Sequence, residues 1–352
     1  MRARIWVATF PVALVLLAAS APWAAIGAVG SAAVTCTSSW SAADEPPNPG
    51  GLSGPDILNG VTVLSSTNAW AVGSYFNGMA DRTLIMHWNG SSWKIAASSN
   101  RGGPASENFL TGVAAASASE IWAVGKYDDG AAFQTLIERW NGTSWANVAS
   151  PDPGGPANNN VLNGVTATST SNVWAVGYYF KQGGAYRTLT VHWTGTAWSS
   201  VPSANAGPPG EDNMLNAVAA TSASNIWAVG DISDGTADRT LIERRTGSSW
   251  AVVASPNPVT GPADIDVLTG VAATSDSNAW AVGTYSHGTV GRTLIVRWDG
   301  ASWKIVPSPS PGGRAGESVL TGVAASGACS AWAVGYYDSA AVPAQTLALH
   351  WG

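Results

Sequence analysis

Charged residues are scarce in this sequence. Only 11% of its 352 residues are Asp, Glu, Lys or Arg, against about 25% in an ordinary soluble domain. The 22 acidic residues outnumber the 16 basic ones, and no basic cluster occurs beyond the first five residues. Because nucleic-acid affinity comes largely from clustered Lys and Arg, we expect no nucleic-acid partner. Aromatic residues are plentiful, with 19 Trp, which argues against a disordered chain.

Long hydrophobic runs are also lacking, with one exception at the N-terminus. This run extends from Ile5 to Ala19, follows two arginines and is followed by small residues up to Ala33. The pattern indicates a secretory signal peptide over residues 1–33, cleaved between residues 21 and 33. A membrane anchor is the alternative, but the run is shorter than the ~20 apolar residues that span a bilayer. We therefore expect a secreted, extracellular protein with no membrane span after signal cleavage.

The rest of the chain consists of one unit repeated six times. The motif Trp-Ala-Val-Gly recurs every 52 or 53 residues, at Trp70, Trp122, Trp174, Trp227, Trp280 and Trp332. Two further Trp positions accompany it in most repeats, and every Trp after residue 33 occupies one of the three positions. A period near 40 to 50 residues with Trp and Gly signatures is typical of propellers rather than helical solenoids.

The pattern within a repeat predicts four antiparallel strands. In one repeat these are residues 162–168, 173–179, 187–193 and 198–203, separated by turn-like segments. Several repeats have Asn-Gly or Asp-Gly between the third and fourth strands, the strongest short hairpin signal. We therefore predict an all-β fold, a single six-bladed β-propeller of four-stranded antiparallel blades over residues 37–352.

Alternation along the second strand predicts how the blades stack. Trp174 and Val176 point to one face, whereas Ala175 and Gly177 point to the other. The Trp of one blade is expected to fill the hollow over Ala and Gly in the next. Burying each Trp contributes on the order of 2–3 kcal/mol.

The two ends of the repeat region complement each other. Residues 37–43, with Trp40, match only the fourth strand, whereas the last repeat stops at Gly352 after its third strand. We therefore expect the N-terminal strand to complete the last blade and close the ring, which leaves no long exposed edge.

The sequence has only two cysteines, Cys36 and Cys329. Both are expected in turns at the same end of the closing blade, and an exported chain meets an oxidising compartment. A Cys36–Cys329 disulfide is therefore predicted to clasp the chain ends. Two free buried thiols remain the alternative.

The hairpin Asn141-Gly142-Thr143-Ser144-Trp145 is similar to the end of an Asp-box. With the Trp-Ala-Val-Gly strand, it resembles the secreted bacterial propeller repeats of the BNR or Asp-box group, seen in sialidases, although the Ser-x-Asp-x-Gly spacing is not kept. Six blades of this length also resemble the fucose-binding propeller lectins, but none of their sugar-contact motifs maps onto this chain. The resemblance implies the fold and not an activity, because propellers host lectins, hydrolases and lyases alike.

Few residues are candidates for chemistry. His87, His192 and His350 share one repeat position, and Glu138 and Glu243 share another. A metal site or a catalytic pair needs groups that converge from different positions, and an active site breaks repeat symmetry. We therefore interpret these residues as structural and expect no metal, no cofactor and no catalytic residue.

The predicted binding surface is the face from which two connections emerge: the one into the first strand and the one between the second and third strands. Examples are Ser150–Val161 and Tyr178–Tyr186, and long loops on a rigid scaffold are where binding usually resides. This face collects a repeated Tyr: Tyr75, Tyr127, Tyr179, Tyr285 and Tyr337. Beside it comes a repeated Arg: Arg82, Arg187, Arg239 and Arg292.

Two interpretations of these residues are open. In the first, the Tyr rings stack on sugars while the Arg guanidinium groups donate hydrogen bonds to hydroxyls or carboxylates. In the second, Tyr packs between blades and Arg ties a loop to a backbone carbonyl. We hypothesise a monomeric, non-enzymatic binding or scaffold propeller for an extracellular glycan or protein ligand. The alternative is an extracellular hydrolase or lyase acting on glycosides.

Overall fold

The computed structural model describes residues 14–16, 46–51, 54–181, 183–261, 263–286, 288, 290–339 and 342–352. In this part of the chain the regular structure is β-strand, and no helix is present. Consequently no described helix is long and apolar enough to cross a membrane. The expected signal peptide, residues 1–33, lies outside the described residues except for β1 (Leu14–Leu16), which pairs in parallel with β2 (Asp56–Ser65).

Each sequence repeat folds into antiparallel strands that pair in chain order. Repeat 1 comprises β2, β3 (Asn68–Phe76), β4 (Asp81–Trp88) and β5 (Trp93–Ala96). Repeat 2 comprises β6 (Asn108–Ser117), β7 (Glu120–Asp128), β8 (Phe133–Trp140) and β9 (Trp145–Asn147). Repeat 3 comprises β10 (Asn160–Ser169), β11 (Asn172–Lys181), β12 (Ala185–Trp193) and β13 (Trp198–Val201).

The other three repeats continue the pattern. Repeat 4 comprises β14 (Asp212–Ser222), β15 (Asn225–Ser233), β16 (Asp238–Thr246) and β17 (Ser249–Val252). Repeat 5 comprises β18 (Ile265–Ser275), β19 (Asn278–Ser286), β20 (Gly291–Trp298) and β21 (Trp303–Ile305). Repeat 6 comprises β22 (Ser318–Gly327), β23 (Ser330–Ser339) and β24 (Val342–Trp351).

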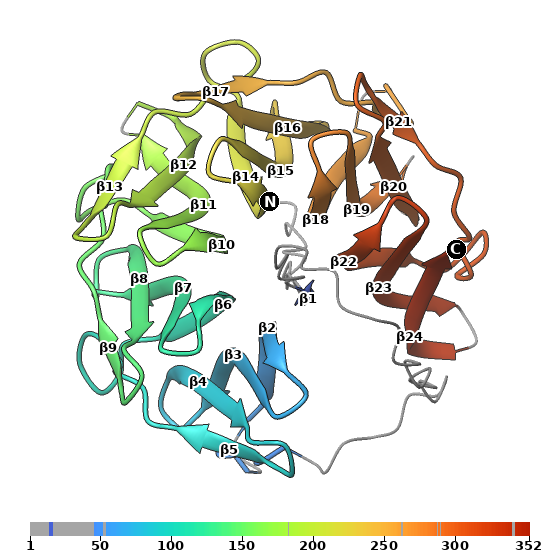
Figure 1. Cartoon of the computed structure of the whole chain (residues 1–352). Helices are drawn as coiled ribbons and strands as arrows, with labels where there is room; N and C mark the ends of the chain where they lie inside the picture. Colours follow the sequence, from blue (N-terminus) through green and yellow to red (C-terminus); the bar gives the residue numbers. More distant parts are fainter. Residues whose placement is uncertain are drawn as a thin grey trace, which may run out of the picture.

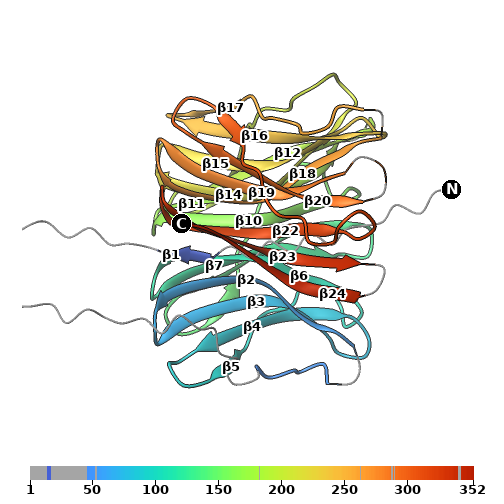
Figure 2. The ribbon, with the colours of Figure 1, turned by 90° about the vertical axis from the view of Figure 1, so that its right-hand side faces the viewer.

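The sheets are arranged around a common centre (Figure 1). The first strand of each repeat lies innermost, and in side view the strands run across the thickness of the disc (Figure 2). This arrangement is an all-β propeller. One parallel bridge, Asp238 to Ile265, joins repeats 4 and 5 into a single eight-stranded sheet, so the count of six blades stays a prediction.

The second strands pack the blades as alternation predicts. Trp122 is fully buried and contacts Val173, Ala175 and other residues of repeat 3 in one apolar cluster. Its ring lies 4.7 Å from that of Trp193, between centroids. The Trp of one repeat therefore covers the Ala side of the next, which confirms the expected stacking.

The motif glycine is required by a close backbone approach. A Cβ built on Gly177 would lie 2.0 Å from the carbonyl oxygen of Val161 on the neighbouring strand. The register shifts by one residue just beyond this contact, between Leu162 and Gly164. Any side chain at Gly177 would therefore push β10 and β11 apart.

A ladder of hydrogen bonds links neighbouring repeats around the centre. In each case a side chain on the first strand donates to a backbone carbonyl on the first strand of the next repeat. The pairs are Asn59–Leu110, Thr111–Leu162, Asn163–Leu215, Asn216–Leu268 and Thr269–Leu320. The ladder fixes the register of the repeats, because one-residue slippage would break every bond in it.

We expect Thr269→Val to lower the free energy of unfolding by about 1–3 kcal/mol. Thr269 is buried, and its hydroxyl donates to the Leu320 carbonyl at 2.7 Å. Valine keeps the shape but leaves this carbonyl without its partner. The matched control is Thr321→Val, because the Thr321 hydroxyl bonds to Val334 within its own repeat in an exposed position. Equal losses in urea denaturation would contradict this role of the ladder.

In the described part of the chain, repeat 6 differs from the others because it has three strands. Two of its indoles are largely uncovered, with Trp332 41% and Trp351 44% exposed, and Leu58 of repeat 1 is 37% exposed. The predicted fourth strand, residues 37–43, lies outside the described residues. Of these side chains, Trp351 lies on β24, to which that strand is expected to add, whereas Trp332 and Leu58 lie where repeat 6 meets repeat 1.

The predicted Cys36–Cys329 disulfide stays a prediction. Cys329 is an exposed free thiol in the turn between β22 and β23. Its exposure argues against the alternative of two buried thiols. Cys36 lies outside the described residues, so the structure does not place it.

Candidate binding face

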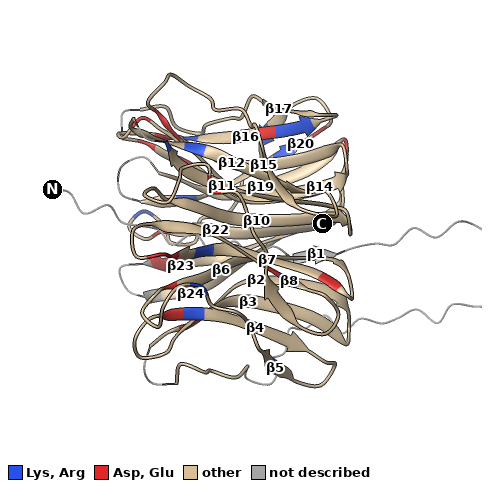
Figure 3. Ribbon diagram, turned by 90° about the vertical axis from the view of Figure 1, so that its left-hand side faces the viewer, with Lys and Arg blue, Asp and Glu red and all other residues tan. Residues whose placement is uncertain are grey.

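The connections between repeats form one face of the disc, which we call the loop face. They are residues 97–107, 148–159, 202–211, 253–264 and 306–317. The expectation of a second long loop between the second and third strands is wrong. In repeat 3, β11 extends to Lys181 and β12 begins at Ala185, because strand pairing continues almost to the turn. Charged residues gather at the strand ends, and most of each strand is free of them (Figure 3).

The repeated Tyr and Arg lie opposite each other on paired strands. Tyr75 is the register partner of Arg82, Tyr179 that of Arg187, and Tyr285 that of Arg292. In repeats 2 and 6 the partner of Tyr127 or Tyr337 is a Gln, and in repeat 4 the partner of Arg239 is Ile232. Tyr127, Tyr179, Tyr285 and Tyr337 pack against apolar clusters between repeats, and Tyr75 packs against a cluster within repeat 1. Packing is therefore one role of these rings.

Three of the four arginines hold loops. Arg82 donates to the carbonyl of Ser106 at 3.0 Å and to that of Gly103 at 3.4 Å. Arg292 donates to the carbonyl of Gly313. These contacts match the second interpretation, in which Arg ties a loop to a backbone carbonyl.

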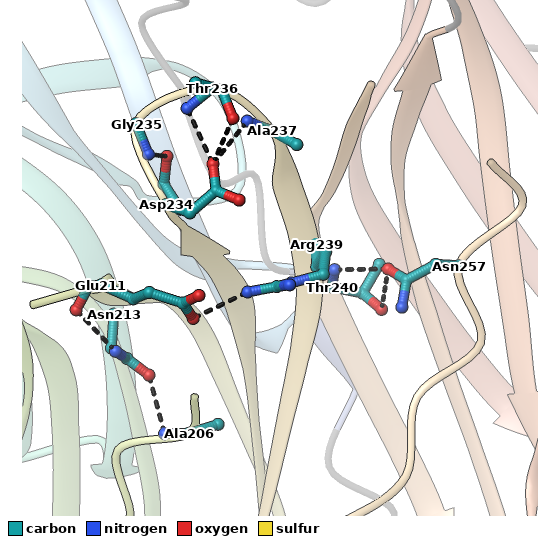
Figure 4. A network of polar contacts seen from close by, with 11 residues as sticks. Ala206, Glu211, Asn213, Asp234, Gly235, Thr236, Ala237, Arg239, Thr240 and Asn257 are labelled. Carbon is teal, nitrogen blue, oxygen red and sulfur yellow. Dashed lines mark hydrogen bonds and ion pairs between the residues drawn. The ribbon is translucent and has the colours of Figure 1, made fainter. Parts of the chain in front are cut away.

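Arg239 reaches a carboxylate instead (Figure 4). Its guanidinium lies 2.7 Å from Glu211 on the connection between repeats 3 and 4. Next to it, the Thr240 amide donates to Asn257 on the following connection at 2.8 Å. The start of β16 is thus held between two loops.

Arg187 differs from the other three. Among the described residues it makes no hydrogen bond and no ion pair, although it is half-buried. Its guanidinium keeps its donors available at the interface between repeats 2 and 3. Ligand binding by the nine Tyr and Arg residues stays a prediction.

One position on the loop face breaks the repeat symmetry, and the sequence interpretation missed it. It is the residue directly after the motif glycine, and it changes chemical class between repeats. The residues are Ser74, Lys126, Tyr178, Asp231, Thr284 and Tyr336. This variation next to an invariant motif is the sequence signal that could have identified the position.

In repeat 2 this position holds a cation between two rings. The Lys126 ammonium nitrogen lies 4.4 Å from the ring centroid of Phe133 and 5.4 Å from that of Phe109. Burial lowers the pKa of Lys126, and the charge of Glu107 acts in the opposite direction. Within the described part of the chain Lys126 forms no ion pair at contact distance.

Lys126 and Arg187 face the same interface. Lys126 shares a strand face with Trp122 and Val124, because side chains alternate. This face packs against Tyr179 of repeat 3, and Arg187 is the register partner of Tyr179. Two cations without ion-pair partners therefore lie beside aromatic rings at one end of this interface.

In repeat 3 the variable position belongs to an aromatic cluster. The ring of Tyr186 lies 5.2 Å from that of Tyr178 and 5.3 Å from that of Phe180, with both contacts edge to face. Asn159 donates to the Tyr186 hydroxyl at 3.3 Å. Burial, with a smaller effect of Tyr186 and Asp231, raises the pKa of Tyr178.

In repeat 4 the position holds a buried carboxyl. Burial raises the pKa of Asp231 to about 7, and the negative charges of Asp238 and Asp212 act in the same direction. Asn216 donates to Asp231 at 3.0 Å. Across the described ranges no three His, Cys, Asp or Glu side chains are grouped so as to hold a metal ion.

The repeated histidines have structural contacts. His87 stacks on Trp70, His192 on Trp174 and His350 on Trp332, with centroids 4.1–4.3 Å apart. In repeats 2, 4 and 5 this position is Arg, which lies over the same Trp. The position supplies a ring or a guanidinium plane that covers the motif Trp.

No protein-family model and no curated protein matches the chain. Solved structures do. A family GH74 xyloglucanase from Xanthomonas campestris is 15% identical, with a TM-score of 0.51, and the match covers 78% of this chain and 44% of that one. The fold is shared. This chain thus spans less than half of the xyloglucanase.

Two other similar structures have lower scores. A Penicillium chrysogenum alpha-L-arabinanase complexed with arabinobiose is 9% identical, with a TM-score of 0.49, and the match covers 80% of this chain and 89% of that one. A fucose-specific lectin from Aleuria aurantia is 13% identical, with a TM-score of 0.45 and coverage of 80% and 86%. Membership in the Asp-box repeat group stays a prediction.

Proposed function

We propose that this chain is a secreted, non-enzymatic binding propeller that recognises carbohydrate on its loop face. The observation that carries the proposal is the interface between repeats 2 and 3. There the half-buried rings of Phe109, Phe133 and Tyr179 accompany Lys126 and Arg187. Aromatic rings stack on the apolar faces of sugars, and these cations donate to hydroxyl or carboxylate groups.

The proposal includes the architecture that presents this face. The ring has six blades, and residues 37–43 add the fourth strand to β24. The uncovered Trp351 on β24 supports this closure, as does a loop contact shared with other repeats. Gly50 donates to Asp56 just as Gly154 donates to Asn160. The domain is exported after removal of residues 1–33 and acts as a monomer.

A glycoside hydrolase or lyase is the second candidate. Its support is Asp231, a carboxyl with a pKa of about 7 on the loop face, since a general acid works best near the ambient pH. Asp231 is only 6% exposed, so a substrate reaches it only after local rearrangement. Carbohydrate binding on the loop face requires no such rearrangement, and we therefore favour binding over catalysis.

The test is a screen of neutral and uronate-containing polysaccharides with the full chain, followed by variants. Arg187→Ala should weaken binding of a retained glycan by roughly tenfold or more, which corresponds to one lost charged hydrogen bond. Its melting temperature should be unchanged, because Arg187 holds no loop among the described residues.

The control is Lys304→Ala, which removes a cation from an exposed ion pair with Asp299 at the turn between β20 and β21. It should keep glycan binding and cost at most about 1 kcal/mol of stability, as expected for an exposed pair. A large stability loss in Arg187→Ala with binding intact would contradict the proposed site. Release of new reducing ends or unsaturated products would favour the enzyme instead.

A further inference from the structure

A buried glutamate lies at the interface between repeats 1 and 2. Glu138 is fully buried, and its Oε2 accepts a hydrogen bond from the Ser99 amide at 3.1 Å. Asn147 donates to the carbonyl of the same Ser99 at 2.8 Å. Ser99 belongs to the connection that leaves repeat 1, so these bonds hold this loop against repeat 2.

The interface between repeats 3 and 4 also has a buried glutamate, at the equivalent position. Glu243 occupies the position of Glu138 two repeats later and is also fully buried. Neither carboxylate oxygen of Glu243 has a hydrogen-bond partner within the described part of the chain. The Ala204 amide and the Thr188 hydroxyl, from the outgoing connection and the third strand of repeat 3, oppose the rise of its pKa. Ala204 stands six residues after Trp198, as Ser99 stands six residues after Trp93.

The other interfaces have a complementary arrangement. Where repeats 1 and 3 present an amide, the equivalent residues of repeats 2, 4 and 5 are Pro151, Pro256 and Pro309. Facing them, the glutamate is replaced by Val191, Val296 and Leu349. Proline has no N–H, so an apolar partner leaves no donor unsatisfied, and Pro309 and Leu349 line one cavity between repeats 5 and 6.

The charged groups around Glu138 are engaged elsewhere. Arg139, next on the same strand, pairs with Glu120 at 2.7 Å. On the packed strands His87 stacks on Trp70, Lys126 lies against Phe133 and Arg82 bonds to Ser106. Burial raises the pKa of Glu138 to about 7, and only the Ser99 hydrogen bond opposes it.

The surroundings of Glu243 are similar. Arg244 lies over Trp227, and Arg245 and His192 cover the two sides of Trp174. On the neighbouring strands, Arg187 is the register partner of Tyr179, which packs toward repeat 2. Asp231 shares a strand face with Trp227, which packs toward repeat 5. Burial raises the pKa of Glu243 to about 8.

We propose that Glu138 and Glu243 are protonation-dependent latches that hold repeat 1 to repeat 2 and repeat 3 to repeat 4 while neutral, and loosen these two interfaces when charged. The proposal goes beyond the binding function and is independent of it. An opened interface admits water to the carboxylate, whereas a closed one keeps the charge buried. The opened state is therefore favoured by deprotonation.

The direction of the pH effect on opening, and the pH range in which it occurs, follow from the pKa values of the glutamates in the opened and closed states. Opened, the glutamates have the ordinary pKa of 4.5; closed, they have values of about 7 and about 8. Between these limits only the closed state keeps the proton. Raising the pH through this range therefore increases opening by about tenfold per pH unit, and above it the effect levels off.

Opening would release a defined segment of the loop face. Directly after Ser99, the Asn100 side chain accepts from Thr83 at 2.9 Å. The Arg101 amide donates to Asn108 at 2.8 Å, and the Arg101 guanidinium lies over Tyr127. The latch at Ser99 is the first of these attachments, so its loss exposes the segment to exchange.

Hydrogen exchange of the full chain at pH 5 and pH 7, corrected for intrinsic rates, tests the proposal. Protection should fall by about 100-fold in the segments around Ser99 and Ala204. The equivalent segment around Pro309 serves as the internal control and should change little. The segments around Pro151 and Pro256 are less suitable, because burial also raises the pKa of Asp152 and of Asp266. A uniform change at all interfaces would overturn the proposal, since Asp231 and Asp266 also have raised pKa values.

Two variants make the test local. Glu138→Gln keeps a hydrogen-bond acceptor without a titrating charge, so the pH response should vanish around Ser99 and persist around Ala204. Ser99→Pro combined with Glu138→Val copies the interface between repeats 2 and 3, and it should fold and lose the response at the same place. A response around Ser99 that survives in either variant would refute the latch.

Discussion

Replacing Trp122 with alanine should lower the free energy of unfolding by about 3–5 kcal/mol, the usual range for deleting a buried large ring. Trp122 is fully buried between repeats 2 and 3. It contacts Trp193, lies edge to face against Trp198 at 5.2 Å between centroids, and is covered by Arg139. The cavity would open within the apolar cluster that joins the two repeats.

The measurement is urea denaturation monitored by circular dichroism. Ile305→Ala is the control, because Ile305 lies on the outer strand β21 and is 44% exposed. Substitutions at such positions change stability by about 0.5 kcal/mol or less. Similar losses in the two variants would mean that the Trp clusters do not hold the blades together.

Deletion of residues 37–45 should lower the melting temperature by on the order of 10 °C, from the lost strand and Trp burial. This follows from the proposed closure. Trp227 packs against Trp298 and Trp303, the third- and fourth-strand indoles of repeat 5. In the described structure the indole of Trp280 contacts one other indole, that of Trp351. Trp40 is expected to supply the second indole, from the fourth strand.

Point variants separate closure from a general effect of shortening the chain. Trp40→Ala should reproduce most of the loss, whereas Ser41→Ala, its neighbour in the sequence, should leave the melting temperature nearly unchanged. Differential scanning calorimetry of the full chain provides the measurement. An unchanged melting temperature in the deletion variant would refute closure by this segment.

Most of the strand pattern was predictable from the sequence. In repeat 3 the predicted strands 162–168, 173–179, 187–193 and 198–203 agree with β10 to β13 within two residues at most ends. Alternation and Gly-containing turns are local properties, so they can be read from one sequence. The exception is the turn after β11, where pairing extends the strands.

The binding face was less predictable, because its contacts join distant segments. In repeats 1, 3 and 5 the strand register places Tyr opposite Arg, as expected. The loop partners of Arg82 and Arg239 lie more than 20 residues away in the chain, and no spacing rule identifies them. The pairing of Glu138 with Ser99 also requires knowing which residues face each other across an interface.

The tryptophan clusters give each blade interface an optical signature. Indole rings 4.7–5.3 Å apart couple their electronic transitions, as in the pairs Trp122–Trp193 and Trp280–Trp351. The interface between repeats 3 and 4 lacks this pair, because Arg245 occupies the position and lies over Trp174. At this interface the remaining indole pair is Trp174–Trp250, edge to face with centroids 5.7 Å apart. Opening there should therefore change the exciton bands in circular dichroism less than opening of the interfaces that also have the closer pair.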